Sequence, residues 1–264
     1  MHRATLDILR CPACLQGSLV PENDVSEPRL IFGPVNCVGC GARFPVGEGM
    51  IDFVGERSRP LGLQRSMESA LVARSYERYL RPALELFLTR GRFDRDSEYT
   101  VYRSLLGRPL GAVIDLGCGT GLFTRRLVRD LDAQLIGVDV SKPMIEEGIA
   151  QAREGAVAID FVRAEAPSLP FQTASVGAIL QAGSMHFIRD LRALLSEVAR
   201  VLKPGGRYVA SHLLVPPLLG PFHAAAGIYP RSERLLRDAT QEAGLNRFER
   251  VKGPPVVVFK VERV

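Results

Sequence analysis

Four cysteines near the start of the chain form two closely spaced pairs. They are Cys11 and Cys14, followed by Cys37 and Cys40, with two residues inside each pair. A tight turn with this spacing points two thiolates at one centre, and two such turns complete the tetrahedral sulfur shell that structural Zn²⁺ prefers. A closed shell leaves no coordination position for a substrate. The spacing therefore predicts a structural zinc site, with free or disulfide-linked cysteines as the alternative.

A second group of residues suited to chemistry follows an apolar run in the middle of the chain. Asp115 closes the run GAVIDLG, glycines stand at positions 117, 119 and 121, and a second apolar run ends at Asp139. Glycines let a backbone turn sharply and approach a ligand closely, and an acid at the end of the next strand can accept hydrogen bonds from ribose hydroxyls. An acid beside the turn suits a positively charged cofactor and would repel a pyrophosphate.

The run Asp115-Leu-Gly-Cys-Gly-Thr-Gly resembles motif I of the class I methyltransferases that use S-adenosylmethionine. FVRAEAPSLPF resembles their third motif, and SVGAILQAGSMHF with LKPGGRYVAS resembles the fourth strand and the turn into the fifth, as in the superfamily that includes quinone C-methyltransferases. An acid usually opens that fourth strand, where this chain has Ser175. The resemblance implies S-adenosylmethionine as the cofactor, bound by Asp115, Gly117, Cys118, Gly119, Gly121, Asp139, Val140, Met144, Glu165, Ala166 and Gln181.

The order of predicted elements fits the same class. From residue 111 strands alternate with helices, and the tail contains a helix that ends at Gly244 and a last strand. We therefore expect an α/β fold, a Rossmann-like sheet of seven strands with an antiparallel final pair, preceded by a small β-rich zinc ribbon. The predicted units are the zinc ribbon at 1–55, a linker and helical lid at 56–106, and the methyltransferase domain at 107–264.

The zinc ribbon has a resemblance of its own. LDILRCPAC and CVGCGARFPVGEGMIDFV resemble the Trm112-like zinc modules, which include activators of RNA and protein methyltransferases and segments fused ahead of methyltransferase domains. Residues 1–60 carry a net charge of −1 (6 − 7), and four thiolates on one zinc ion add a further −2. Such a surface repels phosphates. We interpret it as a packing or partner-binding element, with a homodimer among the expected assemblies.

The helical segment before the sheet contains four tyrosines, at positions 76, 79, 99 and 102. By family resemblance, helices in this place form a lid over the cofactor, so the tyrosines are candidates to face the substrate. The alternative is that they pack the helices against each other.

A general base is optional for methyl transfer, because the methyl group is already activated on a sulfonium. His186, which follows the fourth predicted strand, is the candidate catalytic residue, since a histidine can accept a proton near neutral pH. Packing of His186 beside Phe187 is the alternative reading. His212 and His223 rank behind it, and Cys118 is interpreted as a small apolar filler and not as a nucleophile.

The charge of the chain bounds its partners. The formal net charge is +5, and the excess lies in residues 61–110 and 231–264, each with +3 (9 − 6 and 8 − 5), without a dense basic run. No stretch is apolar enough to span a membrane, and the N-terminus lacks the apolar core of a signal peptide, so we expect a soluble, cytoplasmic protein.

These observations favour a methyltransferase that acts on a small molecule, such as a quinone-like, phenolic or secondary-metabolite acceptor. An RNA methyltransferase is the alternative, and it would need the flanking arginines on one face with the mouth of the cofactor site. A partner module with a vestigial cofactor site is a third reading, which the intact acids and glycines oppose.

Overall fold

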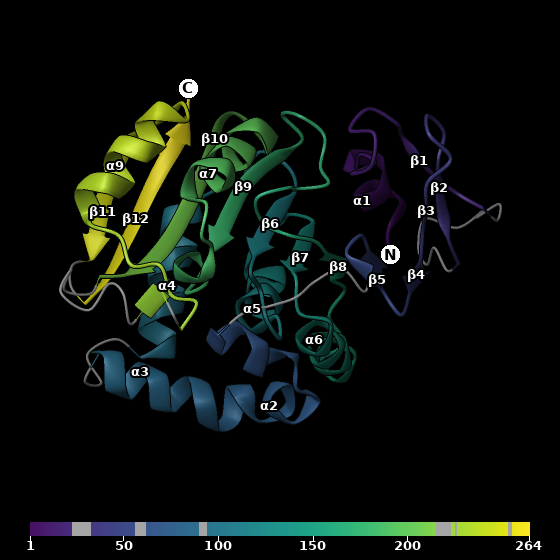
Figure 1. Ribbon diagram of the computed structural model, residues 1–264. Helices are drawn as coiled ribbons and strands as arrows, with labels where there is room; N and C mark the ends of the chain where they lie inside the picture. Colours follow the sequence, from purple (N-terminus) through teal and green to yellow (C-terminus); the bar gives the residue numbers. More distant parts are fainter. Residues whose placement is uncertain (23–32, 56–61, 90–93, 215–222, 225, 253–254) are drawn as a thin grey trace.

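The computed structural model describes residues 1–22, 33–55, 62–89, 94–214, 223–224, 226–252 and 255–264. Its main feature is a nine-stranded sheet in the order β11-β12-β10-β9-β6-β7-β8-β5-β4 (Figure 1). The first seven strands of that order are the predicted methyltransferase sheet, and β12 is antiparallel to both of its neighbours, as expected. Their bounds are β6 (Val113–Leu116), β7 (Leu135–Asp139), β8 (Asp160–Arg163), β9 (Val176–Gln181), β10 (Leu202–Leu213), β11 (Leu245–Lys252) and β12 (Val256–Arg263).

The central strands are buried on both faces, which explains why they read as continuous apolar runs. Successive side chains of a strand point to opposite faces, so Val113 packs in a core with α4 and α5, whereas Ile114 packs in a second core with α7 and α9. The helices that follow the strands are α5 (Leu122–Asp130), α6 (Lys142–Glu154), the short 3₁₀ helix η4 (Met185–Phe187), α7 (Leu191–Val201) and α9 (Glu233–Glu242).

The N-terminal segment contributes to two sheets. It forms α1 (Arg3–Ile8) and an antiparallel sheet of β1 (Leu19–Pro21), β2 (Val35–Cys37) and β3 (Arg43–Phe44). The next strands, β4 (Val46–Gly47) and β5 (Met50–Asp52), join the main sheet instead, where Ile51 pairs with Val162 in parallel β5 and β8. The sheet is therefore two strands wider than predicted.

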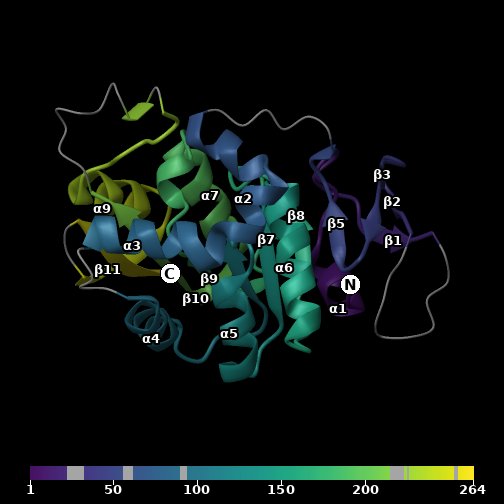
Figure 2. The same ribbon diagram turned by 90° about the horizontal axis from the view of Figure 1, so that it is seen from below.

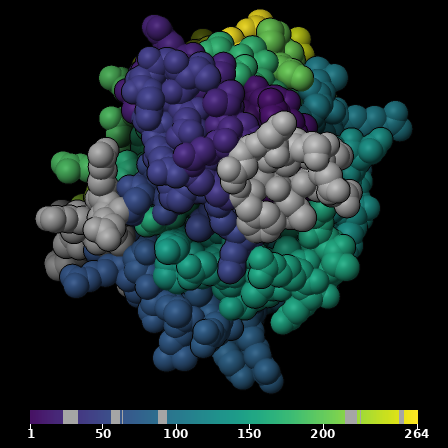
Figure 3. Space-filling model, turned by 90° about the vertical axis from the view of Figure 1, so that its right-hand side faces the viewer, coloured from purple at the N-terminus to yellow at the C-terminus, as the bar shows by residue number. Residues whose placement is uncertain are grey.

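The core of the N-terminal segment is continuous with that of the catalytic domain. Leu6, Leu9 and Cys37 belong to the same buried cluster as Ile114 and Val162. Figure 3 shows the N-terminal residues, in purple and dark blue, packed against the teal residues of the catalytic domain. Since the two parts share one apolar core, the stability of the zinc-ribbon region is coupled to that of the sheet.

A helical segment, which we call the lid, precedes the first central strand. It consists of the 3₁₀ helix η2 (Gly62–Glu68), α2 (Ala70–Ser75), a π-helical turn η3 (Tyr76–Leu80) and α3 (Arg81–Thr89), and α4 (Arg95–Leu106) follows it. In Figure 1 α2 and α3 lie at the bottom, below the carboxyl ends of the parallel strands. None of the described helices is long and apolar enough to span a lipid bilayer.

Candidate functional site

A cavity of about 420 Å³ lies between the lid and the carboxyl ends of β6, β7, β8 and β9. Open parallel sheets bind ligands at this edge. The binding crevice lies outside the carboxyl ends of the strands, at the point where the strand order reverses. All the predicted cofactor residues line it except Gly121, which begins α5 with a left-handed φ of 74°. Cavity-lining residues that sequence reasoning did not assign to the site include Gln64, Met67, Arg81, Thr120, Ser184, Phe187, Ile188, Arg189 and Asp190.

Asp115, the last residue but one of β6, lines the cavity with a buried carboxyl group. Its Oδ2 accepts a hydrogen bond of 2.6 Å from the hydroxyl of Thr124 on α5. Burial raises the pKa of Asp115 to about 6; the hydrogen bond from Thr124 opposes the shift, and the charge of nearby Asp139 adds to it. A buried carboxylate in this state is stabilised by a cationic group placed beside it.

Asp139 connects the two loops that line the cofactor side of the cavity. Its Oδ2 accepts a hydrogen bond of 2.8 Å from the backbone N–H of Gly119, and its Oδ1 accepts one of 2.9 Å from that of Ser141. Each carboxylate oxygen has a second lone pair, which leaves both able to accept from ribose hydroxyls. Burial raises the pKa of Asp139 against these hydrogen bonds.

Glycine is required at position 117 for two reasons. Its φ of 70° is left-handed, and a Cβ there would lie 2.2 Å from the hydroxyl of Ser184. Gly119 also has a left-handed φ, of 54°, but a Cβ at this position would enter open space in the cavity. The turn thus presents bare backbone to a ligand.

The buried amide of Gln181 is a further sign that a polar ligand belongs in the cavity. Its carbonyl accepts a hydrogen bond from the hydroxyl of Tyr208, but its Nε2 has no hydrogen-bond partner. A buried donor without a partner is costly unless a ligand or water satisfies it. Together with the acids and the open glycine turn, this donor fits S-adenosylmethionine, which carries an ammonium group, a ribose and acceptor nitrogens.

The lid contacts the glycine turn through Glu77. The carboxylate of Glu77 accepts a hydrogen bond from the hydroxyl of Thr120 and forms an ion pair of 2.8 Å with Arg125 on α5. These contacts come from the π-helical turn, an element that occurs frequently at functional sites. They fix the lid over the cofactor side of the cavity.

Arg81 is the buried cation of the lid and lines the cavity. It forms ion pairs of 2.7 Å with both Glu85 and Glu98, and its guanidinium lies 4.7 Å from the centre of the Phe123 ring. Burial by itself lowers the pKa of Arg81, but the two carboxylates outweigh it and hold the pKa above its usual value. No motif marked this residue in the sequence, because its role depends on how the lid folds back over the sheet.

The four tyrosines of the lid and α4 were predicted either to face the substrate or to pack the helices, and the structure divides them between these two roles. Tyr76 lines the cavity, whereas Tyr79 points outward with 63% of its surface exposed. Tyr99 and Tyr102 are buried in α4, where both rings pack against Phe123. Only Tyr76 is therefore placed to contact a substrate.

His186 lies beside the cavity and does not line it. Its ring centre is 4.3 Å from that of Phe187 and 6.4 Å from that of His212, whose Nε2 accepts a hydrogen bond from the backbone N–H of Arg231. Burial and the charge of Arg231 lower the pKa of His186 to about 4, and burial, His186 and Arg231 lower that of His212 to about 3. Both rings are neutral near pH 7. A role as general base stays a prediction for His186, as it does for His223.

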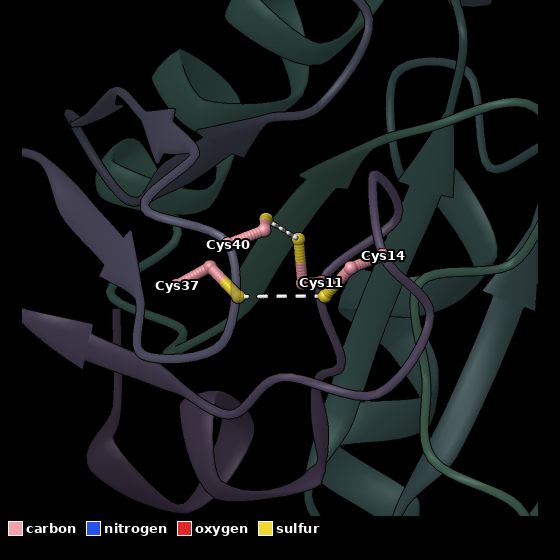
Figure 4. A group of neighbouring side chains, drawn as sticks. All are labelled: Cys11, Cys14, Cys37 and Cys40. Carbon is pink, nitrogen blue, oxygen red and sulfur yellow. Dashed lines mark hydrogen bonds between the residues drawn. The ribbon is translucent and has the colours of Figure 1, made fainter.

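The four cysteines of the N-terminal segment come together as the spacing predicts (Figure 4). Their Sγ atoms lie within 4.8 Å of one another, and the sulfurs of Cys11 and Cys40 are 3.7 Å apart, those of Cys14 and Cys37 3.6 Å. Tetrahedral zinc with Zn–S bonds of about 2.3 Å requires sulfurs about 3.8 Å apart. These separations far exceed a disulfide bond of about 2.05 Å. The cluster therefore fits one tetrahedral metal ion.

The N-terminal segment reaches the cofactor loop through Arg163 at the end of β8. Its guanidinium forms an ion pair of 2.9 Å with Asp52 of β5 and donates a hydrogen bond of 2.9 Å to the carbonyl of Val140. The strand that leaves the four-cysteine segment and the loop that lines the cavity at Val140 thus share one buried cation. Burial by itself raises the pKa of Asp52, but hydrogen bonds from Gly55 and Arg163 outweigh it and lower the pKa below its usual value.

Comparison with known proteins agrees with this geometry. Residues 113–206 match the model of a family described as a methyltransferase domain. The chain is 26% identical to an uncharacterized chloroplastic methyltransferase of Arabidopsis thaliana, across 99% of this chain and 80% of that one. It is 34% identical to a demethylmenaquinone methyltransferase of Beutenbergia cavernae, across 48% of this chain and 50% of that one. Geranyl diphosphate C-methyltransferase from Streptomyces coelicolor shares the fold, with a TM-score of 0.55, 20% identity and coverage of 64% of this chain and 76% of that chain.

Fold, site and comparisons define a class I, Rossmann-like methyltransferase domain behind a four-cysteine segment. The chain therefore contains a methyltransferase domain at residues 113–206, and this family implies S-adenosylmethionine as the cofactor. It spans 80% of the plant relative but only half of the length of the Beutenbergia cavernae enzyme.

We predict that cofactor affinity depends on the protonation of Asp115. The carboxylate attracts the ammonium group of the cofactor, so affinity is highest above the pKa of about 6 and falls by about tenfold per pH unit below it. Calorimetric titration with S-adenosylmethionine at a series of pH values measures this. We expect Asp115→Asn to bind the cofactor more weakly and to lose the dependence of affinity on pH. Asp139→Asn should also bind the cofactor more weakly but should retain the dependence on pH. Constant affinity of the unmodified protein across this range would contradict the prediction.

We also predict that Arg163→Met weakens cofactor binding by about tenfold, because it leaves Asp52 and the Val140 carbonyl without their partner, a loss of about 1.5 kcal/mol. Arg153→Met is the matched control, since Arg153 joins the same two parts of the chain through an exposed ion pair with Glu48. Cofactor titration and thermal unfolding are measured on both variants. Equal cofactor affinity in the two variants would show that Arg163 does not position the loop.

Proposed function

We propose that the protein methylates a small, largely apolar acceptor of the quinone-like, phenolic or secondary-metabolite class. The observation that carries the proposal is the part of the cavity wall outside the predicted cofactor residues, where Met67, Tyr76, Phe187 and Ile188 present apolar and aromatic side chains. Small-molecule sites are mostly apolar, with a few polar groups that fix orientation. Arg81 and Arg189 are the polar groups available here to orient a ring oxygen or a carboxylate.

The residues of the chain serve mainly to align the reactants. Asp115 would hold the ammonium group of S-adenosylmethionine, Asp139 its ribose, and Glu165 and Ala166 its adenine. The cofactor supplies an activated methyl group, so the protein must place the acceptor in line with it and exclude water. The lid, fixed by Glu77 to the glycine turn, covers one side of the cavity, which supports this function.

Ion pairing in the basic flanks gives less support to the RNA alternative. In the tail, Arg237 and Arg250 pair with Glu233, and Arg247 pairs with Glu262. In the lid segment Arg81 is buried between two carboxylates, whereas Arg74 and Arg78 are exposed. Cations that already have carboxylate partners contribute less to phosphate binding.

We further propose that the four-cysteine cluster binds one structural Zn²⁺ ion. All four sulfurs are used, so the site has no open position for catalysis. A cytoplasmic location would suit it, because thiols stay reduced in that compartment.

The function is tested by the transfer of tritiated methyl groups from S-adenosylmethionine into total RNA and, in parallel, into a small-molecule extract of the source cells. We expect label in the extract, abolished by Asp115→Ala. We also expect Phe187→Ala, which alters the acceptor wall, to lower kcat/KM for the labelled acceptor by about tenfold while the cofactor Kd changes little. Asp115-dependent label in RNA alone would overturn the proposal. Cofactor binding without methyl transfer into either sample would favour a partner module with a vestigial cofactor site.

The zinc proposal is tested by elemental analysis of the purified chain. We expect one zinc per chain, lost in Cys11→Ser together with a lower midpoint of thermal unfolding, because Cys11 is a fully buried member of the shared core. Cys118→Ser, which alters the cysteine outside the cluster, should keep the metal. Zinc in Cys11→Ser at the level of the unmodified protein would rule out the assigned site.

A further inference from the structure

The outer face of the lid exposes large apolar side chains in a short stretch of helix. Figure 2 looks onto the lid from below and shows α2 and α3 in front of the sheet. The exposed fraction is 76% for Leu71, 63% for Tyr79, 65% for Leu86 and 81% for Phe87. Single exposed apolar residues are ordinary, but a group of large apolar side chains along one helical segment marks an interaction surface.

The charges of the lid are sorted between its two faces. Its carboxylates point inward, where Glu77 pairs with Arg125 and Glu85 pairs with Arg81. Among the described side chains of residues 70–87, the charged groups in the exposed class are Arg74 and Arg78. The outer face therefore combines cations with leucine, tyrosine and phenylalanine, and carries no exposed carboxylate in this range.

This combination matches an anionic lipid surface. An interfacial helix buries its apolar side chains among the acyl chains, keeps arginines at the level of the lipid phosphates, and often has an aromatic ring at the boundary. The guanidinium of Arg78 lies 5.3 Å from the centre of the Tyr79 ring, so cation and ring already stand together. A second copy of the chain fits less well, because a twofold contact would bring this cationic face against the same cationic face.

We propose that the outer face of α2, η3 and α3 docks on an anionic membrane surface. The opposite side of the same segment supplies Tyr76 and Arg81 to the cavity, so docking brings the cavity close to the lipid, with the lid between them. An apolar acceptor then has a short path from the bilayer to the cavity. The route of the acceptor rests on the proposed function, whereas the docking itself does not.

Docking is tested by sedimentation of the zinc-loaded chain with phosphatidylcholine vesicles, with and without phosphatidylglycerol. We expect binding to the anionic vesicles that weakens as salt is raised. The double variant Arg74→Gln with Arg78→Gln should lose about fivefold in partition for each arginine. Leu86→Ser with Phe87→Ser should bind about tenfold more weakly, because two inserted apolar side chains are lost.

The matched control is Arg234→Gln with Leu235→Ser, which removes an exposed cation and an exposed leucine from α9, on another part of the surface. It should bind vesicles like the unmodified protein. Cofactor affinity should stay unchanged in all three double variants, because none of the altered residues lines the cofactor cavity. This readout separates loss of docking from loss of the fold.

Three outcomes would overturn the proposal. They are failure to bind anionic vesicles at low salt, binding that the lid variants do not weaken, and a dimer in analytical ultracentrifugation that Leu86→Ser with Phe87→Ser abolishes. The last result would assign the face to a second copy of the chain. Vesicle binding requires no methyl acceptor, so its result is independent of whether the methyl-transfer assay succeeds.

Discussion

The structure depends on the placement of two carboxylates, Asp115 and Asp139, at the ends of adjacent parallel strands. Pairing of β6 with β7 brings them to the same edge of the sheet. Asp115 is buried and Asp139 is partly buried, and the charge of Asp139 raises the pKa of Asp115. Backbone N–H groups of the glycine turn and a threonine hydroxyl hold them in place. A cationic cofactor with a ribose relieves this electrostatic cost, and the cavity around the two acids fits it.

The N-terminal segment extends this arrangement at the far edge of the sheet. A chain of contacts runs from β5 through Asp52 and Arg163 to the carbonyl of Val140, next to Asp139. The edge strand also covers β8, which would otherwise present unpaired backbone groups to solvent. This chain of contacts therefore links the four-cysteine segment to the cavity at the ends of the central strands.

The lid has two faces with different tasks. Its inner face carries Glu77, which fixes it to the glycine turn, and Arg81, which lines the cavity. Its outer face is apolar and cationic. A π-helical turn lets consecutive residues serve both faces, since Tyr76 and Glu77 point inward while Arg78 and Tyr79 are exposed. Inward pairing of the carboxylates leaves the outer surface positive, and the proposed lipid contact rests on this sorting of charge.

The sequence by itself determined the local features of this protein. The acids at 115 and 139 and the glycine at 117 stand in one short stretch whose backbone geometry and charge indicate a cofactor turn, and the cysteine spacing predicts the four-cysteine cluster, so both were predictable. The pairing of β5 with β8, the inward turn of Arg81 and the exclusion of His186 from the cavity wall were not. Each depends on contacts between residues far apart in the chain, such as Asp52 with Arg163. Only the tertiary structure decides those contacts, because nothing local to either residue specifies its partner.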